Sequence, residues 1–356
     1  MSAIEFGIIG AGWRAEFYLR IARALPERFR ITGVVVRNPE KRAPVQQTWG
    51  ARVCADTEEL LKTTPPFVVT SVSWASNPAL LKHLSERGVP VLSETPPAPD
   101  LGLLKEVNAL TERGARIQVA EQYWAQPHHQ ACSALIAKGL LGRPTHAQVS
   151  VAHGYHGISL IRRFLGIGFE APRISGRSFT APIIAGAGRQ GPPAREQIRD
   201  SEQEIIFLDW GDRLGVLDFT GDQYFGWIRN RRVLIRGERG EIVNDTAYYL
   251  EDFRTPLAAD LRRDTTGANG NLEGFYLRGI QAGGEWVYRN PFRPAPLSDD
   301  EIAIATCLVA MDEYVRTGRQ FYSLAEASQD HYLSLLCQQA VRQGGEVQAE
   351  QQEWAD

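Results

Sequence analysis

The sequence predicts two domains, an α/β domain with a doubly wound parallel sheet and an α+β domain with a large open, mostly antiparallel sheet. Between residues 4 and 122, short apolar runs alternate with amphipathic stretches, which is the pattern of successive βαβ units. Beyond residue 122 the strand-like runs are longer and tight turns join them, as in antiparallel sheets. The length of 356 residues also exceeds what one core usually organises. We therefore predict domains at 1–122 and 123–356.

The elements of the first domain follow from this hydrophobic pattern. Five or six parallel strands are expected, which is the size of a doubly wound nucleotide-binding domain. The expected strands are 4–10, 30–36, 66–73, 89–94 and 116–122, and the expected helices are 14–25, 39–50, 77–88 and 100–114.

The second domain is expected to begin with a helix near 126–139 and to continue as strands from 145 onward. Turn sequences such as WGDR and TGDQ within 202–245 fit hairpins. Residues 181–200 are rich in Gly, Pro and Arg and predict a long loop, which we interpret as a possible lid. Two helical patterns, 299–318 and 323–345, close the fold.

The composition excludes several classes of partner. Lys plus Arg total 39 against 42 for Asp plus Glu, and a formal charge of -3 gives no field for nucleic acid or an anionic membrane. The four cysteines form neither a CxxC pair nor a disulfide framework, which favours a reducing compartment. No leader pattern or bilayer-length apolar segment stands out. We therefore expect a cytoplasmic protein with no nucleic-acid or membrane partner.

A nucleotide site is predicted where the first strand meets the first helix, at GIIGAGWRA, residues 7–15. Gly10 permits the tight turn, and Gly12 lets the backbone approach a pyrophosphate. The following helix start, with Trp13 and Arg14, supplies amide donors and a positive dipole end. The alternative is a merely structural turn, because this pattern alone is weak evidence.

The end of the second strand favours NADP(H) over NAD(H). An acidic residue there would accept from the ribose hydroxyls of NAD, whereas this chain has Arg37 and Asn38. A guanidinium can hold a 2'-phosphate in bidentate fashion. The alternative is a solvent-exposed basic turn.

The order of motifs resembles the Gfo/Idh/MocA oxidoreductase family over nearly the whole chain. The resemblance rests on GIIGAGWRA, on LSETPP at 92–97, on AEQYWAQPHHQACSALIAKGLLGRPTHAQV from 120, and on HGYHGISLIRRFLG at 153–166. It implies an N-terminal Rossmann domain and hydride exchange between a nicotinamide and a sugar, cyclitol or related polyol. It also implies a homo-oligomer formed through the open C-terminal sheet. The residues themselves predict no metal site, because His128 and His129 have no nearby carboxylate or cysteine pattern.

The resemblance also suggests which residues surround the cofactor and the substrate. Besides the residues of the first turn and of the second strand, the expected cofactor contacts are Ser73, Trp74, Asn77, Glu94, Thr95 and Gln122. His156, with His153 and Thr95 in support, is expected to carry the catalysis, because imidazole accepts and donates protons near neutral pH. The alternative for His156 is a hydrogen-bonded group that caps the following helix.

Two departures from the family pattern place this chemistry in question. Thr95 stands where the family commonly has the lysine of a Glu-Lys-Pro motif, and a hydroxyl brings no positive charge. Ala152 and Ser159 stand where acidic residues usually accompany the histidine.

Other aromatic and histidine residues are expected to have structural roles. Tyr123, Trp124, Tyr224 and Trp227 are one set of aromatic surfaces on which a sugar could stack. The alternative, which we favour, is that 223–237 forms a continuous strand whose aromatic residues fill an interface. His128 and His129 fit solvent-exposed or capping groups.

Three functions therefore remain open. The first, which we favour, is an NADP(H)-dependent oxidoreductase with an atypical site. The second is a nucleotide-binding protein without turnover, and the third is a lyase or hydrolase that keeps a tightly bound nicotinamide.

Overall fold

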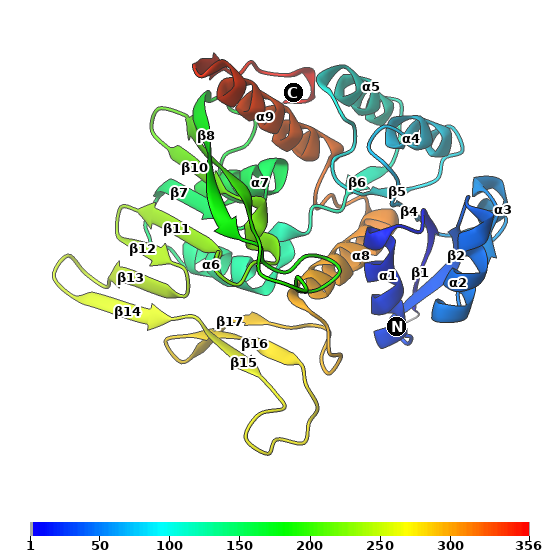
Figure 1. Ribbon diagram of the computed structural model, residues 1–356, viewed down its shortest axis with the longest axis horizontal. Coiled ribbons are helices and arrows are strands. Elements are labelled where there is room, and N and C mark those ends of the chain that lie inside the picture. The colour runs from blue at the N-terminus through cyan, green and yellow to red at the C-terminus, as the bar shows by residue number, and fades with distance from the viewer. Residues whose placement is uncertain (1–2, 356) are drawn as a thin grey trace.

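The computed structural model describes residues 3–355 as two layered units that share a boundary (Figure 1). The N-terminal unit is a 6-stranded parallel sheet in the order β3-β2-β1-β4-β5-β6, which is the Rossmann order. Its strands are β1 (Ile4–Ile9), β2 (Phe29–Val35), β3 (Val53–Cys54), β4 (Val68–Thr70), β5 (Val91–Ser93) and β6 (Ile117–Val119). Its helices are α1 (Trp13–Ala24), α2 (Pro39–Trp49), α3 (Thr57–Leu61), α4 (Asn77–Ser85) and α5 (Leu101–Glu112). The predicted fold class of this half is confirmed.

Alternating side chains divide the core of this sheet between its two faces. Phe6 and Ile8 of β1 pack in one cluster with the buried face of α1, and Ile9 belongs to a second cluster with residues of α3, α4 and α5. Helices therefore cover both faces, as a doubly wound sheet requires.

Most of the remaining chain forms a 9-stranded mixed sheet, β14-β13-β12-β11-β7-β10-β9-β8-β18, and a 3-stranded sheet, β15-β16-β17. Only β7 and β10 run parallel in the larger sheet. The strands of the larger sheet are β7 (Pro144–Ser150), β8 (Arg173–Ile184), β9 (Ile198–Asp209), β10 (Leu214–Phe219), β11 (Arg232–Gly237), β12 (Gly240–Val243), β13 (Thr246–Leu250), β14 (Pro256–Asp260) and β18 (Glu346–Gln348). The smaller sheet consists of β15 (Arg262–Thr265), β16 (Leu277–Ala282) and β17 (Glu285–Arg289). The expected open, mostly antiparallel sheet is confirmed.

The helices of this half are α6 (Pro127–Ala137), α7 (Gly154–Leu165), α8 (Asp299–Thr317) and α9 (Leu324–Gln343), with short 3-10 turns η1 (Tyr123–Ala125), η2 (Gly221–Tyr224) and η3 (Glu353–Ala355). Helices α8 and α9 both begin with a capping box, in which Ser298 pairs with Glu301 and Ser323 with Glu326. These are the two closing helices that the sequence predicts.

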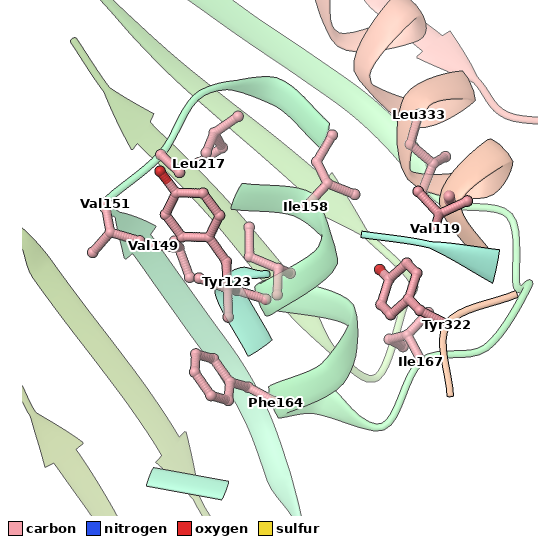
Figure 2. Packing of buried hydrophobic residues seen from close by; sticks show 14 of the residues in the cluster. Val119, Tyr123, Val149, Val151, Ile158, Phe164, Ile167, Leu217, Tyr322 and Leu333 are labelled. Atoms are coloured by element: carbon pink, nitrogen blue, oxygen red, sulfur yellow. The ribbon is translucent and has the colours of Figure 1, made fainter. Parts of the chain in front are cut away.

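Helix α7 packs directly on the large sheet. Figure 2 shows Ile158 and Phe164 of α7 in one cluster with Val149 of β7 and Leu217 of β10. Gly157 allows this close approach, because a Cβ there would lie 2.3 Å from a Leu217 methyl carbon. The chain thus fixes α7, and with it His156, against a rigid support.

Helix α8 belongs by packing to the first unit, although it lies far along the chain. Ile304, Leu308 and Met311 share a core cluster with Phe6 and Tyr18, and α8 runs beside α1 (Figure 1). The boundary after residue 122 stays a prediction, and the C-terminal segment completes the N-terminal core.

In the described part of the chain, no helix has the length and apolar character that a bilayer crossing requires. The four cysteines are buried free thiols.

Candidate active site

A cleft of about 680 Å³ lies where the carboxyl ends of β1, β4 and β5 face α7. This edge of a parallel sheet, between β1 and β4, is the switch point at which such folds bind ligands. The predicted site residues that line the cleft are Gly12, Trp13, Arg14, Ser73, Trp74, Glu94, Thr95, His153 and His156. The structure therefore brings most of the predicted residues together.

The turn between β1 and α1 has the geometry of a phosphate-binding loop. Gly10 has φ +113°, and a Cβ there would lie 2.0 Å from the backbone oxygen of Ser71, so only glycine fits. A Cβ at Gly12 would meet nothing within 4 Å, and Gly12 is the N-cap of α1. The first amides of α1 are therefore free of side-chain capping and open to an anion.

Arg14 joins this turn to the loop after β5. Its Nε lies 3.5 Å from a carboxylate oxygen of Glu94, which also accepts a hydrogen bond from the Tyr18 hydroxyl. With the Gln122 amide oriented to satisfy its neighbours, its oxygen accepts from Arg14 Nη2 at 3.0 Å. Burial raises the pKa of Glu94, and the Arg14 charge opposes this. Gln122 thus holds Arg14 and does not itself line the cleft.

Arg37 and Asn38 lie beyond this cleft, at the end of β2. Arg37 is exposed, and the Asn38 side chain caps α2 by accepting from the Glu40 amide at 3.0 Å. Arg42 donates from Nε to the Val36 carbonyl at 2.9 Å. Two guanidinium groups therefore flank the strand end where a ribose would lie in this fold.

Asn77 does not lie in the cleft, which contradicts its predicted cofactor contact. Its amide is buried and accepts from Thr70, while it donates to Ser93 and to the Pro97 carbonyl, each at 2.8 or 2.9 Å. All of these bonds join the ends of neighbouring strands. Asn77 therefore fixes the loops around the cleft. Ser73 and the half-exposed Trp74 remain at the cleft wall.

His156 forms a buried pair with Glu121, a residue that the sequence analysis does not single out. His156 Nδ1 lies 2.6 Å from Glu121 Oε2, and the side chains are 5% and 2% exposed. The other Glu121 oxygen accepts from the Tyr123 amide at 3.0 Å. With Nδ1 occupied, Nε2 is the nitrogen left for a ligand in the cleft.

Burial sets the protonation of this pair. It raises the pKa of Glu121 to about 8, and burial together with the nearby Arg14 charge lowers the pKa of His156 to about 3. At neutral pH the pair is therefore uncharged overall and holds one proton that it can give up near pH 8.

Tyr155 and Thr95 form the floor beside this pair. The Tyr155 ring centroid lies 4.4 Å from that of His156, and both Tyr155 and Thr95 line the cleft. Burial raises the pKa of Tyr155, so its phenol stays protonated. Thr95 lines the cleft as predicted and brings a hydroxyl without charge.

His153 is exposed and faces Tyr224, which accepts from the His153 amide at 3.1 Å and lies 2.5 Å from its Nδ1. The predicted strand over 223–237 is wrong in its first half, because η2 and a loop precede β11, which begins at Arg232. Tyr224 consequently lines the cleft, as Tyr123 does, whereas Trp227 is 77% exposed. Both tyrosines therefore lie where stacking on a sugar would need them, and the interface role stays a prediction.

The two acidic positions that this chain lacks hold structural residues. Ala152 is fully buried, and the Ser159 hydroxyl donates to the His156 carbonyl within α7. Glu121, which follows β6, is instead the acidic partner of His156. It comes from a different element than the acidic residues expected next to the histidine in the sequence. The signal for it was the single carboxylate in the strand pattern at 116–122.

His128 and His129 are not solvent-exposed groups. His129 is buried with Nδ1 2.7 Å from the Tyr123 carbonyl, and His128 lies 3.3 Å from Asp245. Within residues 3–355, no three His, Cys, Asp or Glu side chains come together as a metal site would need.

The fit to a dinucleotide can be judged from the residues present. The open approach at Gly12 and the uncapped amides of α1 match a pyrophosphate. The guanidinium groups at the end of β2 match the ribose end of the nucleotide.

Comparison with known proteins agrees with this geometry. Residues 4–121 match the Gfo/Idh/MocA family model, described as an oxidoreductase family with an NAD-binding Rossmann fold. A search of curated proteins finds no match.

Several solved structures share the fold over nearly the full length of both chains. An oxidoreductase from Agrobacterium radiobacter, solved with NAD+, L-tartaric acid and magnesium, has a TM-score of 0.68 at 18% identity and covers 97% of this chain and 98% of its own. A myo-inositol dehydrogenase from Corynebacterium glutamicum has a TM-score of 0.66 at 16% identity, covering 98% and 99%. The WlbA dehydrogenase from Chromobacterium violaceum, solved with NADH and UDP-GlcNAcA, has a TM-score of 0.62 at 17% identity, covering 99% and 97%.

These likenesses confirm the fold, and the family match falls on the domain that carries the nucleotide site. The N-terminal part of the chain, residues 4–121, therefore resembles the Gfo/Idh/MocA family, which is described as an oxidoreductase family with an NAD-binding Rossmann fold.

Proposed function

We propose that the protein transfers hydride between NADP(H) and a CH-OH or ketone group of a sugar, cyclitol or related polyol. The observation that carries this proposal is the His156–Glu121 pair, 2.6 Å apart in the cleft at the switch point of the Rossmann sheet. The solved relatives named for inositol or bound to UDP-GlcNAcA support the substrate class.

The proposed roles of the N-terminal residues follow from their places. Gly10, Gly12 and the amides of α1 hold the pyrophosphate, and Trp13 and Arg14 flank it. Ser73, Trp74 and Glu94 surround the nicotinamide end. A bound nicotinamide supplies or accepts the hydride.

His156 acts as acid and base through Nε2. When Glu121 is ionised, it accepts from Nδ1–H, and Nε2 presents a lone pair that takes the proton of a substrate hydroxyl. When the pair holds its extra proton, Nε2–H donates to a substrate carbonyl oxygen. The carboxylate fixes the ring orientation and stabilises the protonated imidazole.

Neighbouring hydroxyl groups orient the substrate. Thr95, Tyr155, Tyr224 and His153 all line the cleft with His156, and the ring centroids of Tyr155 and His153 lie 4.4 and 5.1 Å from that of His156. The positive charge that a lysine at position 95 would bring is absent. Burial lowers the pKa of His156 most, and the charge of Arg14 lowers it further.

The pair predicts a defined pH dependence. Because Glu121 has a pKa of about 8, raised by burial, the base form grows as pH rises through 8. We expect kcat/KM for alcohol oxidation to rise to a plateau above about pH 8, and that for ketone reduction to fall over the same range. Pre-steady-state rates at 340 nm, measured in both directions, would check this.

Glu121→Gln is the matched variant for that profile, because the amide oxygen still accepts from Nδ1–H but does not titrate. The step near pH 8 should disappear. An unchanged profile in this variant would assign the titration to another group.

The preference for NADP(H) rests on Arg37 and Arg42 at the end of β2. We expect Arg37→Asp to weaken NADPH binding by about 10- to 100-fold, since a charge-assisted bidentate contact is lost and a repulsive one gained. NADH should change by less than about 3-fold because it has no 2'-phosphate. Arg113→Asp, the same charge change at the opposite edge of the sheet, is the control. Equal effects on the binding of both nucleotides would contradict the proposal that Arg37 binds the 2'-phosphate.

The function itself is tested by a screen of sugars, cyclitols and other polyols with NADP+ and NAD+, following absorbance at 340 nm. Turnover of at least one substrate that is lost in His156→Asn supports the proposal. Nucleotide that copurifies and does not exchange would instead favour the lyase or hydrolase. Exchangeable nucleotide without turnover would favour the non-catalytic protein.

We also propose that the open face of the large sheet binds a second copy of the chain. Cross-strand partners Phe207, Val216, Gln148, Leu234 and Val243 continue one row across this face, opposite α7 and α9. Phe207 is 43% exposed there, and a row of this kind fits an oligomer interface.

A further inference from the structure

The wall of the cleft that comes from the C-terminal domain carries a positive charge without an acidic partner. Arg231 precedes β11, is exposed and lines the cleft. Among residues 3–355, none of the ion pairs involves its guanidinium, whereas neighbouring arginines of this domain such as Arg232 and Arg236 lie beside a carboxylate.

The acidic side chains of the same cleft are already engaged. Glu94 lies against Arg14 and Tyr18, and Asp300 accepts from Gln126 at 2.7 Å. Arg231 and Arg189 are therefore the charged groups on this wall that remain available to a ligand.

Arg231 also lines the same cleft as His156 of the proposed acid/base pair. Tyr123 and Tyr224 line this cleft as well. The Tyr123 ring centroid is 4.6 Å from that of His156, and Tyr224 contacts His153. Arg231 therefore shares the cleft with the aromatic residues that surround the imidazole.

The other free guanidinium of the cleft lies on the cofactor side. Arg189, from the loop between β8 and β9, stacks over Trp13 with 4.3 Å from its Cζ to the ring centroid. Trp13 is the first residue of α1, so Arg189 lies at the phosphate-binding turn. It is therefore not the group that meets the substrate.

We propose that the cleft takes a polyhydroxy acid whose carboxylate binds Arg231, with a hydroxyl-bearing carbon beside His156. This rests on the proposed function and names the substrate class for it. The planar guanidinium matches a carboxylate with two parallel hydrogen bonds, and Tyr224 and Tyr123 supply hydroxyl or ring contacts next to it. A neutral polyol would leave Arg231 solvated and gain nothing from its charge.

The test compares matched pairs that differ only in the acid group, namely glucose with glucuronate and galactose with galacturonate. Each is titrated into protein loaded with NADPH, following the nicotinamide fluorescence. We expect each uronate to bind about 10- to 100-fold more tightly than its hexose, and added salt to weaken only the uronate. Arg231→Gln should abolish the difference. Arg229→Gln, two residues away and outside the cleft wall, should preserve it.

Three outcomes would overturn the carboxylate assignment. They are equal binding of acid and hexose, no uronate binding at millimolar concentration, and a hexose 6-phosphate that binds through Arg231 more tightly than the uronates do. The proposed function is read separately, from hydride exchange at 340 nm. Turnover of neutral polyols without a preference for acids would support the proposed function and contradict the carboxylate assignment. Uronate binding without hydride exchange would contradict the proposed function and support recognition of the carboxylate by Arg231.

Discussion

Replacing His156 with asparagine is expected to lower kcat/KM by about 10²- to 10⁴-fold on the best substrate, because the only proposed proton carrier of the cleft is lost. Asparagine retains a polar group that can still bond to Glu121, so the fold and the nucleotide site should persist. Steady-state kinetics with NADP+ give the loss in rate, and a fluorescence titration should return a dissociation constant for NADPH within about 3-fold of the wild type.

His153→Asn is the matched comparison. His153 is exposed and bonds to Tyr224 without a carboxylate partner, so its loss should cost less, about 10-fold. If His153→Asn proved the more damaging of the two, the acid/base role would move to His153 and Tyr224.

Replacing Arg162 with methionine is expected to lower the free energy of unfolding by about 3–5 kcal/mol, since it leaves a buried carboxylate without its counter-charge. Arg162 of α7 lies 2.5 Å from Asp330 of α9, with side chains 6% and 3% exposed. Arg162 also donates to the Gly168 carbonyl from Nε and Nη2, and the Tyr322 hydroxyl donates to Asp330. This network fixes α7 on α9 and thereby positions His156.

Urea denaturation followed by circular dichroism measures that loss. Arg316→Met removes an exposed pair with Asp312 on α8 and should cost no more than about 1 kcal/mol. Equal losses in the two variants would mean that the buried network adds no more stability than a surface pair.

The fold was predictable because its signals are local and repeated. Apolar runs alternate with amphipathic helices up to residue 122, and the capping sequences at Ser298 and Ser323 mark the two closing helices. Local signals could not predict which elements pack against one another. Helix α8 packs on α1 of the N-terminal unit because its apolar face matches the uncovered side of that sheet, which depends on contacts far apart in the chain.

The site was predictable in part, for the same reason. The turn at Gly10 and Gly12 carries its own sequence signature, and His156 stands in a recognisable motif. Glu121 completes the pair only because β6 ends opposite α7, and no spacing rule links residues 121 and 156. Tyr224 enters the cleft because the chain forms a turn at η2 before β11, although its sequence alternates like a strand.

Asn77 illustrates the opposite error. Its position after β4 suggested a cofactor contact, but an amide there satisfies three groups at the strand ends, and burial made that use more favourable. Residues proposed to contact ligands therefore lie beside residues that stabilise the loops at this edge of the cleft. Their hydrogen bonds distinguish the two kinds of residue.

The most direct test of the account is a titration of the purified protein with NADPH and NADH, following nicotinamide fluorescence after a check for copurified nucleotide. We predict saturable binding of both nucleotides, with tighter binding of NADPH, and loss of this preference in Arg37→Asp. Absence of binding to either nucleotide, with none copurified, would contradict it, because the cleft beside the His156–Glu121 pair would then serve no hydride transfer.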